Sequence, residues 1–180
     1  SATTKTFDKV NNEMYKMASE DFGNPSSLHR LGLNAEEKLK FTRNIFAKSI
    51  GCDEGEVYFT SGGTEANNLC ITGYLMRNKR AGKKIITSAV EHASVLTQFN
   101  HLSEMGYEVV YIPFDKEKGF DYDMLENEVD ANTALVSIMH VNNETGYIFD
   151  IKRIKDIILK KNKNTVLHCD CVQSYMKIPF

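Results

Sequence analysis

The sequence predicts an α/β protein with a mostly parallel sheet and helices on both faces of that sheet. Short apolar segments alternate with longer segments of helical periodicity, the order expected of repeated β-α units. The apolar segments are nearly continuous, as expected for strands that are covered on both sides. The chain has 180 residues, of which 42% are hydrophobic and 26% charged, so it is long enough to bury a core of its own.

The beginning of the chain predicts two helices separated by a turn. Apolar residues recur at helical spacing from Phe7 to about Asp21. The following segment, 22–27, is rich in turn residues and contains Pro25, which disfavours a helical conformation of the residue before it. A second helix is expected from about Leu28 to Ile50, and the glycine that follows it is typical of a helix end.

Strands and helices then alternate to the end of the chain. Strands are expected near 57–60, 84–88, 107–112, 134–140 and 166–170, and helices near 65–80, 94–105, 121–129 and 150–161. We therefore divide the chain into an N-terminal helix and loop segment, 1–27, and part of a larger domain, 28–180. A sheet that ended after residue 170 would leave an open apolar edge, so we expect further chain, or another chain, to complete the fold.

Composition and charge give no reason to expect a nucleic-acid-binding, membrane-spanning or disulfide-rich protein. The net charge of −2 gives no electrostatic reason to expect binding to nucleic acid or to an anionic membrane. No apolar run approaches the roughly 20 residues of a membrane span, and the first residues lack a signal-peptide pattern. The four irregularly spaced cysteines predict no disulfide framework, so a reducing cytoplasm is the expected location. Cys169 and Cys171 lack the Cys-x-x-Cys spacing of zinc sites, and we expect them to be structural rather than metal ligands.

Four of the predicted strands run into polar clusters. These clusters are 61–68, 91–92, 142–144 and 170–174. Ligands of open parallel sheets bind outside the carboxyl ends of the strands, so we expect the four clusters to meet around one site. Together they suit an anionic, electron-withdrawing cofactor.

Two of the clusters suggest how such a cofactor would be held. Gly63 and Thr64 lie between a predicted strand and a predicted helix. A helix N-terminus preceded by glycines binds phosphate well. The alternative is a tight turn in which Thr64 only caps the helix. Asp170 follows an apolar strand, where a carboxylate needs a cationic or hydrogen-bonding partner. A protonated pyridine nitrogen would be such a partner, and the alternative is an Asp that caps the next turn.

The other two clusters offer side chains for proton transfer and polar contact. His92 has a flat ring that can stack on an aromatic cofactor and exchange protons near neutral pH. A lone histidine is, however, more often a partly buried residue with its own partners. Asn142 and Asn143 can bond a phenolic oxygen or a substrate carboxylate, or they can simply form an Asn-rich loop that ends at Gly146.

Six segments match, in order, the motifs of one enzyme family: 1–4, 22–27, 59–68, 91–92, 137–146 and 170–174. In these segments, and over essentially its whole length, the chain resembles cysteine desulfurases of the NifS/IscS type. These are class V pyridoxal-phosphate enzymes, and the resemblance implies part of the large domain of a fold type I transferase. It also implies pyridoxal 5'-phosphate as the cofactor and a homodimer as the assembly.

The resemblance assigns roles to six residues of this sequence. Gly63 and Thr64 would contact the cofactor phosphate, and His92 would stack on the ring and take part in proton transfer. Asn143 would lie near the ring hydroxyl and the substrate. Asp170 would pair with the ring nitrogen, and Gln173 would bond the ring oxygen.

The implied reaction converts L-cysteine to L-alanine and leaves the sulfur on an enzyme cysteine as a persulfide. An acceptor protein, such as an iron–sulfur scaffold, then receives the sulfur for cluster or thio-cofactor synthesis. The family's Schiff-base lysine follows a histidine in a Ser-x-His-Lys segment, and no lysine follows a histidine here. None of the four cysteines matches the family's persulfide loop. We therefore expect these 180 residues to be inactive alone. The alternatives are a selenocysteine lyase, another class V enzyme, or a truncated paralogue that acts as a binding module.

Overall fold

The computed structural model describes residues 4–178, which form two compact units with a division between Phe59 and Thr60. The matched motif residues Ser1-Ala2-Thr3 and the final Pro179-Phe180 lie outside the described residues. The expected domain boundary after residue 27 stays a prediction. Each unit is described separately below.

The first unit contains the two expected helices. They are α1 (Asp8–Ser19) and α2 (Arg30–Ile50), followed by the short 3-10 helix η1 (Glu54–Glu56). Gly51 closes α2 with φ 70°, a left-handed conformation that glycine adopts without steric cost. Both helix predictions are confirmed.

The strand predicted at 57–60 is wrong, because this segment is irregular. The Nε of Arg43 donates to the main-chain oxygen of Val57 at 3.2 Å. The Arg43 guanidinium also lies 5.3 Å from the centre of the Phe59 ring, and Phe46 packs edge-on against the same ring. A strand is stable only when a neighbouring strand takes up its backbone groups, and no described strand pairs with this segment. The segment packs against α2 instead.

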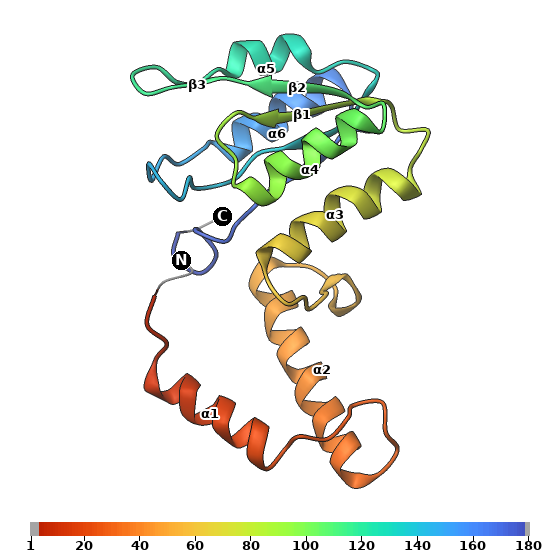
Figure 1. Cartoon of the computed structure of the whole chain (residues 1–180), viewed down its shortest axis with the longest axis vertical. Helices are drawn as coiled ribbons and strands as arrows, with labels where there is room; N and C mark the ends of the chain where they lie inside the picture. The colour runs from red at the N-terminus through yellow and green to blue at the C-terminus, as the bar shows by residue number, and fades with distance from the viewer. Residues whose placement is uncertain (1–3, 179–180) are drawn as a thin grey trace. The chain divides into compact units, whose positions relative to one another are not determined.

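The second unit contains the predicted parallel sheet and the helices that cover it (Figure 1). Its elements are α3 (Gly63–Arg77), β1 (Lys84–Ser88), α4 (Ala93–Glu104), β2 (Glu108–Ile112), β3 (Phe114–Asp115), β4 (Gly119–Phe120), α5 (Tyr122–Glu128), β5 (Thr133–Ser137), α6 (Ile151–Lys161) and β6 (Val166–His168). The strands of the main sheet are all parallel and have the order β2-β1-β5-β6. The small antiparallel pair β3–β4 was not predicted.

Helices cover both faces of this sheet, and each face has its own core. Ile85 of β1 points into a cluster with residues of α3 and α4, such as Ile71 and Phe99. Its neighbour Ile86 points the other way, into a cluster with residues of α5 and α6, such as Ile154. Figure 1 shows α4 on one side of the sheet, with α5 and α6 on the other. The continuous apolar strands of the sequence are explained by this double burial.

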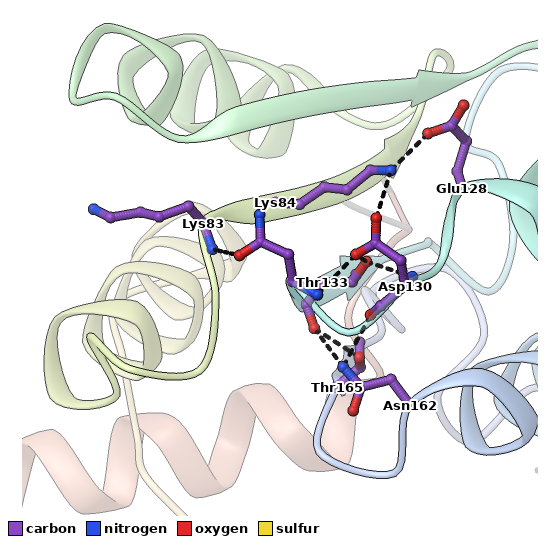
Figure 2. Close-up of polar contacts among 8 residues, drawn as sticks. Lys83, Lys84, Glu128, Asp130, Thr133, Asn162 and Thr165 are labelled. Carbon is purple, nitrogen blue, oxygen red and sulfur yellow. Dashed lines mark hydrogen bonds and ion pairs between the residues drawn. The ribbon is translucent and has the colours of Figure 1, made fainter.

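The amino ends of the strands are joined by a polar network (Figure 2). The buried Nζ of Lys84 contacts the carboxylates of Glu128 at 2.8 Å and Asp130 at 3.3 Å. The Thr165 hydroxyl donates to the main-chain oxygen of Thr133 at 2.7 Å. These contacts join the starts of β1 and β5 to the loop after α6. They stabilise the edge of the sheet at which the strands begin.

The strand order creates a switch point between β1 and β5. From β1 the chain crosses through α4 to β2 on one side, whereas from β5 it crosses through α6 to β6 on the other. The segments that leave β1 and β5 therefore diverge, and such a place at the carboxyl edge is where open α/β sheets bind ligands. None of the described helices is both long enough and apolar enough to span a membrane.

Candidate functional site

The segments that follow β1, β5 and β6 meet at the carboxyl edge of the sheet. Beyond the end of β5, the amide of His140 donates to the main-chain oxygen of Asp170 at 3.0 Å. The amide of Met139 donates to Oε1 of Glu91, which follows β1, at 2.9 Å. Three of the four expected polar clusters are thus brought together after strands. The fourth, 61–68, follows the irregular segment instead.

Asp170 is buried and both of its carboxylate oxygens accept hydrogen bonds. Oδ1 accepts from the amide of Val172 at 2.9 Å, which is the turn-capping contact that the sequence offered as an alternative. Oδ2 accepts from Nδ2 of Asn67 on α3 at 2.8 Å. The turn contact and a contact to a distant helix therefore coexist, and they fix the plane of the carboxylate.

Hydrogen bonds continue from Asp170 through Asn67 and Ser94 to His92. The Asn67 amide also donates to Oγ of Ser94 at 3.0 Å, so its two protons are shared between Asp170 and Ser94. The Ser94 hydroxyl is then free to donate to Nδ1 of His92, 2.9 Å away, and the Ser94 amide donates to the same nitrogen at 3.1 Å. With Nδ1 acting as an acceptor, the proton of the neutral imidazole is on Nε2.

Asn67 and Ser94 are site residues that the sequence reasoning missed. Asn67 lies four and eight residues before Ile71 and Leu75, and all three are buried on the same face of α3. An amide in line with the apolar face of a helix needs a partner in the interior, and this was the available signal. Ser94 carried no such signal, because a serine in the first turn of a helix is common.

Glu91 is the other residue whose importance emerges only from the structure. Its Oε1 accepts from the Ser88 hydroxyl at 2.6 Å and from the amide of Met139. Its Oε2 is buried and has no hydrogen-bond partner among the described residues. Burial raises the pKa of the Glu91 carboxyl to about 7, against the lowering effect of its two hydrogen bonds. The negative charge of Asp170 raises this pKa further.

A pocket of about 430 Å³ lies between the segments that follow β1 and β5. Two predicted site residues line it, His92 and Asn143, and both are exposed. Glu91 forms part of the same wall, and Phe114 supplies an aromatic ring. The pocket therefore combines an imidazole, an amide and an apolar surface, which suits a small polar molecule with a flat ring.

The two adjacent asparagines have different surroundings. Asn142 is buried, and its Oδ1 accepts from the amides of Glu144 and Thr145 while its Nδ2 donates to the main-chain oxygen of Val90. Asn142 therefore shapes the loop that ends at Gly146, as the sequence alternative stated. Asn143 has an exposed side chain at the pocket and remains the candidate for ligand contact.

The glycine-rich segment begins α3 as expected, but Thr64 does not cap the helix. The cap residue is Gly62, which has no side chain to accept the first amides, and Thr64 is the second residue of the helix. A Cβ atom on Gly63 would lie 3.0 Å from Val172, so Gly63 is beside the turn that contains Asp170. The first turn of α3 thus offers uncapped amides next to that turn.

The structure brings the six predicted residues together to different degrees. His92 and Asn143 share the pocket, Asp170 is connected to His92 by hydrogen bonds, and Gly63 lies beside the turn after β6. No contact of Thr64 or Gln173 side chains with this pocket is present among the described residues. The roles assigned to all six residues stay predictions.

Comparison with known proteins agrees with this architecture. The family described as aminotransferase class-V matches residues 1–180. The chain is 41% identical over 178 residues to cysteine desulfurase IscS 1 of Archaeoglobus fulgidus, covering 98% of this chain and 46% of the relative. It is 42% identical to cysteine desulfurase IscS of Buchnera aphidicola, covering 98% of this chain and 44% of that relative.

Two solved structures are similar over almost all of the chain. A NifS-like protein aligns with a TM-score of 0.94 and 38% identity, covering 99% of this chain and 49% of the other. SspA in complex with cysteine aligns with a TM-score of 0.90 and 31% identity, covering 98% of this chain and 50% of the other. The chain spans about half the length of the relatives it matches.

Proposed function

Because this chain belongs to the class-V aminotransferase family, we propose that it forms part of a pyridoxal-phosphate-dependent cysteine desulfurase. Such an enzyme is a transferase that converts L-cysteine to L-alanine and passes the sulfur, as a persulfide on an enzyme cysteine, to an acceptor protein. The identity to curated cysteine desulfurases supports this activity, and the complex of a structural relative with cysteine supports the substrate.

The residues present suit the proposed cofactor. Asp170 is a buried carboxylate without a cationic partner among the described side chains that bond it, and a protonated ring nitrogen would supply that positive charge. The uncapped amides at the start of α3 suit a phosphate, and Gly63 leaves room for a close approach of the backbone. When bound, pyridoxal 5'-phosphate supplies an electron sink for bond breaking at the substrate.

The side chains of this chain would bind, orient and exchange protons. Asp170 would hold a proton on the ring nitrogen, and Gln173 would donate to the ring oxygen. His92 would transfer protons at Nε2, because Nδ1 is occupied by Ser94. Asn143 orients the substrate beside the ring.

One observation carries this assignment: a buried carboxylate, Asp170, is connected through Asn67 and Ser94 to an imidazole at the wall of a pocket. A purely structural Asp would need only its turn contact. The hydrogen-bonded connection to His92 supports the proposal that Asp170 serves the ring nitrogen while His92 transfers protons.

We further propose a homodimer in the cytoplasm, with an iron–sulfur scaffold as the sulfur acceptor. The family resemblance supports the dimer and the acceptor. Four free thiols, at Cys52, Cys70, Cys169 and Cys171, support a reducing compartment.

The test is a product assay on the full-length polypeptide that contains this chain. The purified protein is supplied with pyridoxal phosphate, a reductant and L-cysteine, and alanine and sulfide are measured together. Equal amounts of both products are expected. Turnover of selenocysteine but not of cysteine would assign the protein to the selenocysteine lyases, and absence of turnover with either amino acid would overturn the proposal.

A further inference from the structure

Two cysteines flank Asp170 and lie within reach of each other. The Sγ atoms of Cys169 and Cys171 are 3.6 Å apart, at hydrogen-bond distance for two thiols. Both residues are half-buried. Among the described residues, no group of three or more His, Cys, Asp or Glu is arranged to hold a metal ion. The pair is therefore a site for the chemistry of two thiols alone.

The two thiols differ in reactivity. The hydrogen bond with Cys169 lowers the pKa of the Cys171 thiol, although burial opposes this effect. The same hydrogen bond and burial raise the pKa of Cys169. The hydrogen bond thus makes Cys171 the more acidic thiol of the pair. This is the arrangement expected of an attacking cysteine beside a resolving cysteine.

A bond between the two sulfurs would act on the backbone of the residue between them. An S–S bond is about 2.05 Å long, so the sulfurs would approach by about 1.5 Å. Bridged cysteines have Cα atoms about 4.4–6.8 Å apart, most often about 5.5–6 Å. A bridge of this geometry would fix the backbone on both sides of Asp170, the one residue between the two cysteines. The approach of the sulfurs would disturb the bonds of its carboxylate to Asn67 and Val172 and of its main-chain oxygen to His140.

We propose that Cys169 and Cys171 form a reversible intrachain disulfide when the protein meets a hydroperoxide, and that this bond releases the cofactor by displacing Asp170. The thiolate of Cys171 attacks one peroxide oxygen, so that an S–O bond forms and the O–O bond breaks. The departing oxygen takes a proton and leaves as alcohol, or as water when the oxidant is hydrogen peroxide. Cys171 then carries a sulfenic acid.

The second step uses Cys169. Its sulfur, after losing its proton, attacks Sγ of Cys171, an S–S bond forms, and the S–O bond breaks with release of water. Together the two thiols lose two electrons, which reduce the peroxide. A small thiol restores the pair by exchange. The disulfide depends only on the cysteine pair, whereas its effect on the cofactor rests on the proposed function.

The test exposes the full-length protein to hydrogen peroxide and then alkylates the remaining thiols. The peptide that contains both cysteines is expected to be lighter by two hydrogens and to escape alkylation. Dithiothreitol should reverse both effects. Cys169→Ser and Cys171→Ser should each abolish the disulfide. The matched control is Cys70→Ser, which removes an exposed thiol of α3 outside the pair and should leave disulfide formation unchanged.

The bound cofactor is followed in parallel by its absorbance after gel filtration. Loss of cofactor on oxidation and its return after reduction support the coupling to Asp170, and equal retention in both states overturns that coupling. A sulfinic acid on Cys171, or a bridge to a different cysteine, overturns the disulfide itself. Should the reduced protein bind no pyridoxal phosphate, the proposed function fails, while the alkylation result still decides the disulfide.

Discussion

The Asn67 amide nitrogen lies 2.8 Å from the Asp170 carboxylate, although 103 residues separate the two in sequence. The contact joins the second turn of α3 to the segment after β6, and it is made in the interior. A hydrogen bond to a buried charged group is among the stronger contacts in proteins. It fixes the orientation of the carboxylate that we assign to the cofactor nitrogen.

Replacing Asn67 with alanine should therefore weaken both stability and cofactor binding. Loss of a donor to a buried carboxylate costs about 2 kcal/mol, and we expect cofactor affinity to fall about tenfold, as a loss of about 1.4 kcal/mol implies. Urea unfolding and cofactor titration of the full-length protein measure the two effects. Asn78→Ala is the control, because Asn78 lies exposed at the end of the same helix and bonds only a main-chain oxygen. Equal losses of stability and of cofactor affinity in the two variants would argue against Asn67 as the residue that orients Asp170.

Glu91 should make stability depend on pH in the acidic to neutral range. Its pKa is raised from 4.5 to about 7 in the folded protein. Between these values the folded protein holds a proton that the unfolded chain has lost, so the free energy of unfolding falls as the pH rises through this window. Above about pH 7 the free energy of unfolding no longer changes through this group. The full shift corresponds to roughly 3 kcal/mol.

Glu91→Gln removes the titrating group while keeping an oxygen for Ser88 and Met139. Urea unfolding measures how much the free energy of unfolding falls from about pH 5 to about pH 8. We expect this fall to be smaller by roughly 2–3 kcal/mol in the variant than in the unaltered protein. Glu108→Gln changes an exposed carboxylate on β2 and should leave the pH dependence unaltered. Identical pH dependence of Glu91→Gln and the unaltered protein would mean that Glu91 is ionised throughout.

Sequence patterns predicted the sheet well because its strands are continuous apolar runs. The runs containing Ile85 and Val136 are recognisable without any knowledge of their partners. The segment 57–60 has the same apolar character, yet its state depends on whether a neighbouring strand pairs with it. Tyr58 is 75% exposed, so composition alone misjudged this segment. Pairing is a property of the assembled sheet rather than of one segment.

The sequence allowed prediction of those candidate-site residues whose side chains have a distinctive chemistry. Asp170 and His92 stand out because a carboxylate and an imidazole at strand ends are chemically distinctive. The partners that orient them, Asn67 and Ser94, come from two different helices, and only the folded chain brings them together. The same holds for Glu91, whose carboxyl becomes unusual only through burial.

Removal of the Lys84 side chain should loosen the amino edge of the sheet. Lys84 is buried between Glu128 and Asp130, and their hydrogen bonds raise its pKa although burial alone would lower it. Both carboxylates remain partly exposed, so we expect Lys84→Ala to cost about 2 kcal/mol, less than the 3–5 kcal/mol of a fully buried pair.

The adjacent Lys83 provides a matched control for this experiment. Figure 2 shows its side chain pointing away from the network, and only its main-chain amide bonds Asn132. The Nζ of Lys83 lies 4.4 Å from the centre of the Tyr107 ring instead. Lys83→Ala removes only this cation–π contact and should lower the free energy of unfolding by about 0.5–1 kcal/mol. If urea unfolding gave equal losses for both lysines, the network would contribute nothing specific to this edge.

Two glycines of α3 should respond differently to alanine. Gly73 lies in the middle of the helix with nothing near the position of an added Cβ, so Gly73→Ala should stabilise the protein by about 0.5–1 kcal/mol. Gly63→Ala would place a Cβ 3.0 Å from Val172 at the proposed phosphate site and should weaken cofactor binding. Thermal unfolding and cofactor titration separate the two effects. Weaker cofactor binding in Gly73→Ala would show that the helix as a whole, rather than its first turn, controls the cofactor.

An exchange of Asn67 and Asp170 would separate the structural role of Asp170 from its proposed role at the cofactor. Asp170→Asn alone removes the charge and sets two amides against each other, so both stability and activity should fall. In the double variant Asn67→Asp/Asp170→Asn, a donor and a carboxylate again face each other, and we expect stability to return to within about 1 kcal/mol. The charge, however, is now on α3.

The cofactor nitrogen should lose its partner in the exchanged protein. An adjacent opposite charge shifts a pKa by about 1–3 units, so a ring nitrogen without this charge holds its proton correspondingly less tightly. Alanine production from cysteine should therefore stay about 10- to 1,000-fold below that of the unaltered protein, even though urea unfolding shows a stable fold. Full activity in the exchanged protein would limit Asp170 to a structural role, because the negative charge would then be on α3 and not beside the ring nitrogen.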